Sequence, residues 1–178
     1  IMNRQARKYF LINAIGFLIG FSFLTISCNK ISPAGFWKNY HPYLKVKEIS
    51  DQGPWGGYRI IHWETRNDVT LDKNDILKYA KTNGWKLIDS SKYSKILPKS
   101  WAFRDKAIFP YNYDESNDLD NKINDKLPRW IESDFELYSF KTGWIIINPE
   151  SDDSTERTGF IIISNDLRKM TVYHLWGE

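Results

Sequence analysis

The sequence predicts an α+β fold: a mostly antiparallel sheet with a C-terminal four-stranded meander and one or two helices, preceded by an N-terminal hydrophobic helix. Three features lead to this prediction. Short apolar runs separated by turn residues fill the C-terminal third, helical spacing occurs in two segments further upstream, and residues 10–26 carry no charge. Strand-forming runs interrupted by few helices are typical of α+β proteins.

Four apolar runs in the C-terminal third are predicted to be the strands of the meander. Lys141-Thr142-Gly143, between the first two runs, is interpreted as a tight turn, because glycine accepts the positive φ that such turns require. The two runs of three isoleucines are apolar at every position, which predicts central strands covered on both faces, with more alternating strands outside them. The four strands are expected at residues 135–140, 144–147, 160–163 and 170–176.

Upstream of the meander, the sequence predicts a strand, a helix, a further strand and a second short helix. The first strand is expected at residues 58–65, and the first helix begins at Asp72, whose carboxylate can cap the free amides of the first turn. Asn83-Gly84 ends this helix, since glycine accepts left-handed geometry, and the next strand follows at once. The second helix is expected over residues 118–127, where apolar residues recur every four positions.

The N-terminal region has the pattern of an export signal. Arg4, Arg7 and Lys8 precede the uncharged run of 17 residues, and Ser27 and Cys28 follow it. A basic start, an apolar stretch and a small residue before the break are typical of such signals. Cys28 is the only cysteine, so it has no disulfide partner within the chain but could carry a lipid.

The end of this region, Leu24-Thr25-Ile26-Ser27-Cys28, resembles the lipobox of bacterial lipoproteins, although Thr25 stands where that family usually has leucine. The resemblance covers residues 2–28. It implies attachment of diacylglycerol to Cys28, cleavage before it, and acylation of the new amino terminus. The alternative is an uncleaved signal anchor over residues 10–26, because about 17–25 apolar residues span a bilayer.

We therefore expect three parts: a signal peptide or signal anchor at residues 1–27, the lipidated cysteine and a tether at residues 28–35, and a single globular domain at residues 36–178. By resemblance to lipoproteins of enteric-type bacteria, Asn29 in place of an aspartate favours the outer membrane. Lys30-Ile31-Ser32 contains no acidic cluster, which favours the periplasmic face over the cell surface. An uncleaved anchor would instead hold the chain in the inner membrane.

The charge balance argues against nucleic acid as a partner. The chain has 25 basic and 22 acidic residues, and all three basic residues before Cys28 belong to the signal. The remainder is therefore neutral overall. Because a surface that binds a phosphate backbone needs a basic excess on one face, no nucleic-acid partner is expected.

No catalytic, metal-binding or cofactor-binding residue is predicted. His41, His62 and His174 occur without a G-x-S-x-G motif, and each is expected to have a structural or surface role. His62 and Glu64 share one strand face and could supply two metal ligands, but the sequence identifies no third. The acidic segment 114–120 lacks the glycine and the closing glutamate of an EF-hand.

Aromatic residues are the remaining indication of function. Trp37, Tyr40, Tyr43, Trp55 and Tyr58 lie close together in segments that are partly loop. Aromatic side chains that stay exposed favour a binding surface, whereas the alternative is that they pack beneath the loops.

Together these observations favour a membrane-anchored cell-envelope lipoprotein with a non-catalytic domain that binds another protein, as an envelope factor or an immunity-type protein. Its membrane contact would be the lipid on Cys28 or the helix at residues 10–26. Two alternatives stay open: an envelope lipoprotein that binds a ligand or a glycan, and a cell-wall hydrolase that uses Asp or Glu residues.

Overall fold

The computed structural model describes residues 34–66, 69–94, 102–103, 106–107, 127–147 and 154–177. The chain divides into two compact units, Ile1–Gly35 and Phe36–Glu178, and the fold described below is that of the second unit. The predicted signal segment with Cys28 lies outside the described residues, as do residues 118–126 of the predicted second helix. Among the residues that are described, no helix is both long and apolar enough to cross a bilayer.

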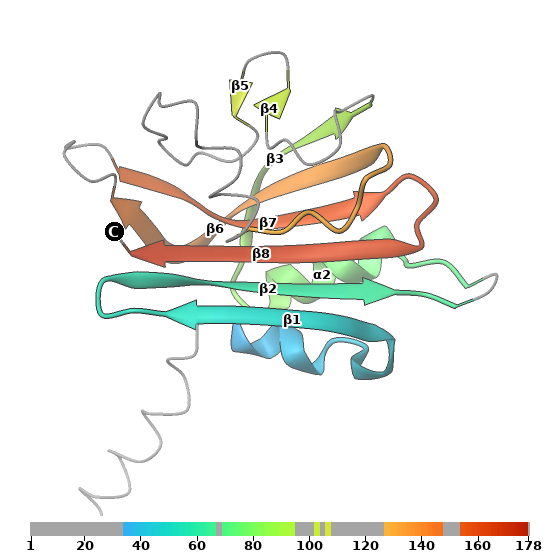
Figure 1. The fold of residues 1–178 in the computed structure, drawn as a ribbon, viewed down its shortest axis with the longest axis horizontal. Helices are drawn as coiled ribbons and strands as arrows, with labels where there is room; N and C mark the ends of the chain where they lie inside the picture. Colours follow the sequence, from blue (N-terminus) through green and yellow to red (C-terminus); the bar gives the residue numbers. More distant parts are fainter. Residues whose placement is uncertain are drawn as a thin grey trace, which may run out of the picture. The chain divides into compact units, whose positions relative to one another are not determined.

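Six strands form one sheet in the order β1-β2-β8-β7-β6-β3, and neighbouring strands run antiparallel (Figure 1). One α-helix, α2 (Lys73–Thr82), and a short 3₁₀ helix, η1 (Gly35–Asn39), belong to the described part, together with η2 (Pro42–Leu44). The strands of the sheet are β1 (Lys45–Gln52), β2 (Gly56–Glu64), β3 (Lys86–Tyr93), β6 (Phe135–Ile147), β7 (Ser154–Ser164) and β8 (Lys169–Gly177). A separate pair is formed by β4 (Ala102–Phe103) and β5 (Lys106–Ala107). The predicted mostly antiparallel sheet with a helix is confirmed.

Helix α2 begins and ends where the sequence predicts. The Asp72 carboxylate accepts hydrogen bonds from the backbone N–H groups of Asn74 at 2.8 Å and Asp75 at 3.4 Å. These bonds satisfy amides that have no partner within the first turn. Beyond the other end, Gly84 has a φ of +91°, which a side chain would strain. The chain therefore leaves the helix and enters β3 within a few residues.

The four-stranded meander predicted for the C-terminal third is wrong, because its first two strands are one. β6 continues through Lys141-Thr142-Gly143 and pairs with β7 on both sides of this tripeptide, as in Phe140↔Gly159 and Ile146↔Thr155. The register shifts in this stretch, and Gly143 has a φ of +88°. The glycine thus produces an irregularity in a long strand rather than a chain reversal. The meander has three strands, β6, β7 and β8.

The positions of the strands within the sheet also differ from expectation. The isoleucines of β7 are buried as predicted, but Ile145 and Ile147 of β6 are exposed. β8 is a central strand, buried from Met170 to Trp176, because the β1–β2 hairpin pairs with its second edge. The edge strands are β1 and β3.

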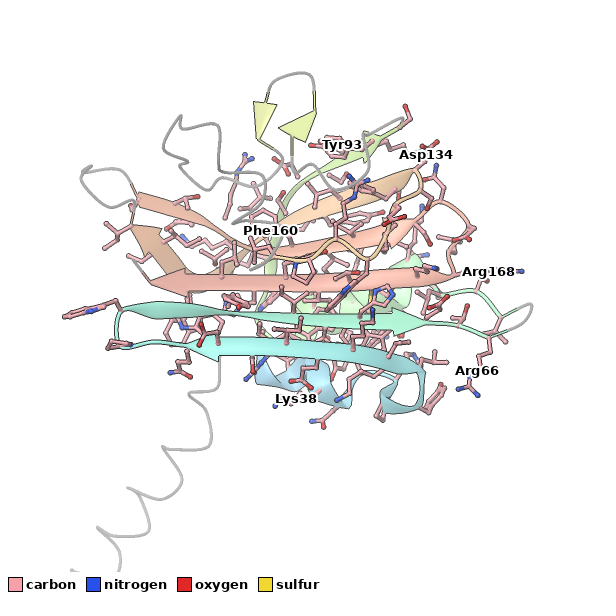
Figure 2. The ribbon with its side chains drawn as sticks, viewed as in Figure 1. Lys38, Arg66, Tyr93, Asp134, Phe160 and Arg168 are labelled. Atoms are coloured by element: carbon pink, nitrogen blue, oxygen red, sulfur yellow. The ribbon has the colours of Figure 1, made fainter. Side chains whose placement is uncertain are left out.

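Apolar layers cover both faces of the sheet. Phe160, labelled in Figure 2, belongs to one of them. This layer also contains Tyr173 and Ile60, and residues Leu127 and Ile131 pack against it from the segment before β6. The other layer is aromatic and lies between the sheet and α2, which Figure 1 shows behind β2 and β8.

Trp37 is the centre of the aromatic layer. It is fully buried, and its ring lies among those of Phe36, Tyr40, Trp63, Tyr79 and Trp85, with centroid distances from 5.1 to 6.0 Å. Trp63 belongs to β2 and Tyr79 to α2, so Trp37 joins the helix to the sheet. The Tyr79 hydroxyl also donates a hydrogen bond to the Phe36 carbonyl at 2.8 Å.

We predict that Trp37→Ala lowers the free energy of unfolding by about 3–5 kcal/mol, because it empties a site enclosed by rings. Urea denaturation followed by far-UV circular dichroism measures this change. Trp55→Ala is the matched control, since Trp55 is 74% exposed in the β1–β2 turn, and its loss should change stability by no more than about 0.5 kcal/mol. Equal effects of the two substitutions would contradict the assignment of Trp37 as the central packing residue.

Candidate functional site

A groove lies between the second half of α2 and the start of β3, with a volume of about 740 Å³. We call this hollow the α2–β3 groove. Its apolar lining comes from Leu77, Trp85, Leu87 and Phe140, and its basic lining from Lys78, Lys81 and Lys86, with Gly84 completing it. The lining contains no acidic residue.

The floor of the α2–β3 groove is built from two buried rings. Trp85 and Phe140 are almost completely buried, and their centroids are 5.4 Å apart. Trp85 sits above Gly159 of β7, where a Cβ atom would lie 2.8 Å from the Trp85 ring and 2.6 Å from the Thr142 methyl group. Glycine is therefore required at residue 159 for the indole to reach the sheet.

Behind this floor, His174 belongs to a buried chain of hydroxyl groups. Its Nε2 lies 3.0 Å from Thr142 Oγ1, which lies 2.6 Å from Thr158 Oγ1, and Thr158 donates to the Trp144 carbonyl at 3.2 Å. Since the final acceptor is a carbonyl, the direction of donation runs from the His174 Nε2–H through both threonines. Burial is the main cause that lowers the pKa of His174 to about 3. The ring is therefore neutral at physiological pH and acts as a packing and hydrogen-bonding residue.

The outer wall of the α2–β3 groove is apolar and accessible. Leu87 pairs with Phe140 in the β3–β6 ladder, so both residues lie on the α2 face of the sheet. Leu87 is 52% exposed and its neighbour Ile88 is 42% exposed. The register shifts between Leu87 and Asp89, which places Ile88 at an irregularity of this edge strand. The apolar lining of the groove thus includes an exposed side chain of β3.

At the other end of α2, Glu136 of β6 holds the helix and the neighbouring strand β3 together. Its carboxylate accepts hydrogen bonds from Lys73 of α2 at 2.5 Å and from Tyr138 at 2.6 Å, and it pairs with Lys92 of β3 at 3.1 Å. The hydrogen bond from Lys73, followed by that from Tyr138, lowers the pKa of Glu136 to about 2. This carboxylate is therefore ionised throughout the physiological range.

The histidines highlighted by the sequence are spread over the domain. His41 lies near the surface, in a left-handed conformation with a φ of 37°. His62 is buried on β2, with Nδ1 at 2.7 Å from Thr171 Oγ1, and burial is the main cause that lowers its pKa to about 4. Glu64 pairs with Lys169 at 3.3 Å. In the described part of the chain, no group of three or more His, Cys, Asp or Glu side chains could hold a metal ion.

The aromatic residues that the sequence groups together separate in the structure. Trp37 and Tyr40 are buried in the aromatic layer, Tyr43 and Trp55 are exposed, and Tyr58 is partly buried against the other apolar layer. The predicted lipidation residue, Cys28, lies outside the described residues. Sequence reasoning did not find the lysines of the α2–β3 groove, because lysines on a helix surface are usually only solvated.

Comparison with known proteins gives no relative: no family model, no curated protein and no solved structure matches the chain.

We predict that the domain loses stability as the pH falls from about 4.5 towards 2, and that Glu136→Gln reduces this loss. The pKa of Glu136 is lower in the folded protein than its ordinary value of 4.5. The ionised carboxylate therefore stabilises the fold fully above that value, and this contribution is lost as the pH falls through the folded pKa. Urea midpoints measured across this range test the prediction.

Tyr138→Phe tests the same carboxylate with a smaller change. It removes one hydrogen bond to Glu136 and leaves the one from Lys73 in place. Its pH dependence should fall between those of the wild type and Glu136→Gln. A Glu136→Gln variant with an unchanged acid response would show that other groups control stability at low pH.

Proposed function

We propose that the chain is a membrane-anchored cell-envelope lipoprotein whose domain, Phe36–Glu178, is a non-catalytic module that binds another protein. The anchor is the lipid on Cys28, and the domain faces the periplasm from the outer membrane. An envelope assembly factor and an immunity-type protein are the two roles that fit such a module. No cofactor or nucleic acid takes part.

The α2–β3 groove is the observation that supports protein binding. Isolated apolar side chains on a surface are ordinary, whereas contiguous ones mark interaction sites. Here the exposed Leu87 lines a hollow whose floor is formed by Trp85 and Phe140, and the next residue of β3, Ile88, is also exposed. Partner side chains that enter such a hollow lose contact with water, which is where interfaces gain most of their free energy.

The surroundings of the buried histidines support a non-catalytic role. A general base works best with a pKa near the operating pH. Burial moves the pKa of His62 to about 4 and that of His174 to about 3, far below that range. Each ring has a threonine hydroxyl within hydrogen-bonding distance instead of a nucleophile poised in an open cleft.

The export and lipobox patterns of residues 2–28 support the anchor. More than one acyl chain is needed for firm anchoring, because each buried methylene contributes about 0.8 kcal/mol and a single chain binds only marginally. Acylation of both the Cys28 thiol and the new amino terminus would supply these chains.

We predict that the intact mass of the membrane-extracted protein corresponds to a chain that begins at Cys28 and carries acyl groups. Cys28→Ser should remove both the cleavage and the added mass, since no other thiol is present. Ser27→Ala, which keeps a small residue before the cysteine, is the control and should be processed normally. An unmodified full-length chain from wild-type cells would contradict lipidation.

We predict that affinity purification after mild cross-linking of native membranes recovers a specific protein, and that Leu87→Asp abolishes this recovery. A buried carboxylate at the rim of an apolar contact costs several kcal/mol when it is unpaired. Ile49→Asp on the opposite edge strand β1 is the matched control, since Ile49 is also an exposed aliphatic residue at 39%. Repeated recovery of no specific protein would contradict the proposed function.

A further inference from the structure

We infer that the α2–β3 groove binds a segment of a partner protein that carries both acidic and apolar side chains. The apolar side chains of that segment would contact Trp85, Phe140 and Leu87, and its carboxylates would pair with Lys78, Lys81 and Lys86. This inference rests on the proposed function and specifies the chemistry of the partner.

The lysines of the groove differ from the other lysines whose side chains are described. Six of those others pair with glutamates, namely Lys38, Lys45, Lys73, Lys92, Lys141 and Lys169. A seventh, Lys47, lies over the Trp130 ring at 5.6 Å. Lys78, Lys81 and Lys86 have no ion pair with any described acidic side chain, and all three line the same hollow. Among the described lysines, the three without a glutamate or ring contact therefore all lie at the groove.

This concentration of charge has an energetic cost within the free protein. Lys78 and Lys81 are three positions apart on α2, where side chains of like charge are neighbours and repel. Lys86 lies directly opposite Lys141 across the β3–β6 ladder, where like charges repel, although the pairing of Lys141 with Glu156 offsets part of this repulsion. Carboxylates from a partner would convert this repulsion into attraction, because complementary charges raise the association rate and select the partner.

A protein segment fits the groove better than a small enclosed ligand. Small-molecule sites cover most of the surface of their ligand. Leu87, which lines the α2–β3 groove, is 52% exposed and belongs to the edge strand β3. An extended segment can follow this strand and place alternate side chains into the hollow.

The test uses the full lipidated chain in nanodiscs and three fluorescent peptides of equal length. In these peptides, leucine alternates with glutamate, with glutamine or with lysine. Fluorescence anisotropy at low salt should give the Glu peptide an affinity about tenfold above that of the Gln peptide, which corresponds to about 1.4 kcal/mol, and the Lys peptide should bind weakest. The preference should shrink at high salt, because the rim charges are exposed to screening.

The variant Lys78→Glu/Lys86→Glu should invert this order, so that the Lys peptide binds best. The matched control is Lys47→Glu/Arg66→Glu, which changes the net charge equally at sites outside the groove lining; Arg66 lies just beyond the end of β2 (Figure 2). The control should keep the preference for the Glu peptide. Circular dichroism of both variants verifies that each is folded.

The possible results separate this inference from the proposed function. Equal binding of the Glu and Gln peptides would contradict the inference that the partner segment is acidic. So would a charge preference that the control variant also inverts. If a native partner is nevertheless recovered from membranes and lost in Leu87→Asp, only the charge assignment fails. If the peptides behave as expected but no native partner exists, the proposed function fails and the binding chemistry of the groove stands.

Discussion

The packing of Trp37 is the contact on which the arrangement of the domain depends. Helix α2 is short and buries only Ile76 and Ala80 as apolar residues, which is little surface to hold it on the sheet. The indole of Trp37 supplies further contact, because its ring lies close to those of Trp63 of β2, Tyr79 of α2 and Trp85 just before β3. Aromatic rings supply large buried areas with defined geometry. The distance between the walls of the α2–β3 groove is therefore set by rings that lie beneath it.

The helix and the edge strand are attached to the sheet by different means at their two ends. Near the start of α2, the ionised Glu136 joins Lys73 and Lys92, and this end is held by charge and hydrogen bonds. Near the end of α2, Trp85 packs above Gly159, and this end is held by shape. The groove lies at this end of α2, and its lysines have no acidic residue beside them in the lining. Polar contacts thus hold one end of α2, and apolar packing holds the end that borders the groove.

Local signals in the sequence were sufficient for the elements that depend on local chemistry. Asp72 and Gly84 mark the ends of α2 because capping and left-handed geometry act within one turn. Local signals could not decide whether residues 141–143 form a turn or an irregularity within a strand, because glycine with a positive φ occurs in both. Only the long partner strand β7, which continues past the tripeptide, decides between them.

The candidate site was less predictable than the fold. Lys78 and Lys81 have the same local pattern as lysines on any solvated helix surface, and Lys86 starts an ordinary edge strand. What distinguishes them is the absence of acidic partners in space among the described side chains, and this depends on how distant strands are ordered. The apolar floor was likewise invisible, because Trp85 and Phe140 are separated by more than one element of the chain.

The central position of β8 has a consequence for the order of assembly. His62 of β2 contacts Thr171 of β8 across a separation of 109 positions, so the β1–β2 hairpin meets its neighbour only after all of the intervening chain has been made. Until then both edges of that hairpin are open, and long-range pairing of this kind slows folding. The six-stranded sheet therefore stays incomplete until β8, the last of its strands along the chain, has been made.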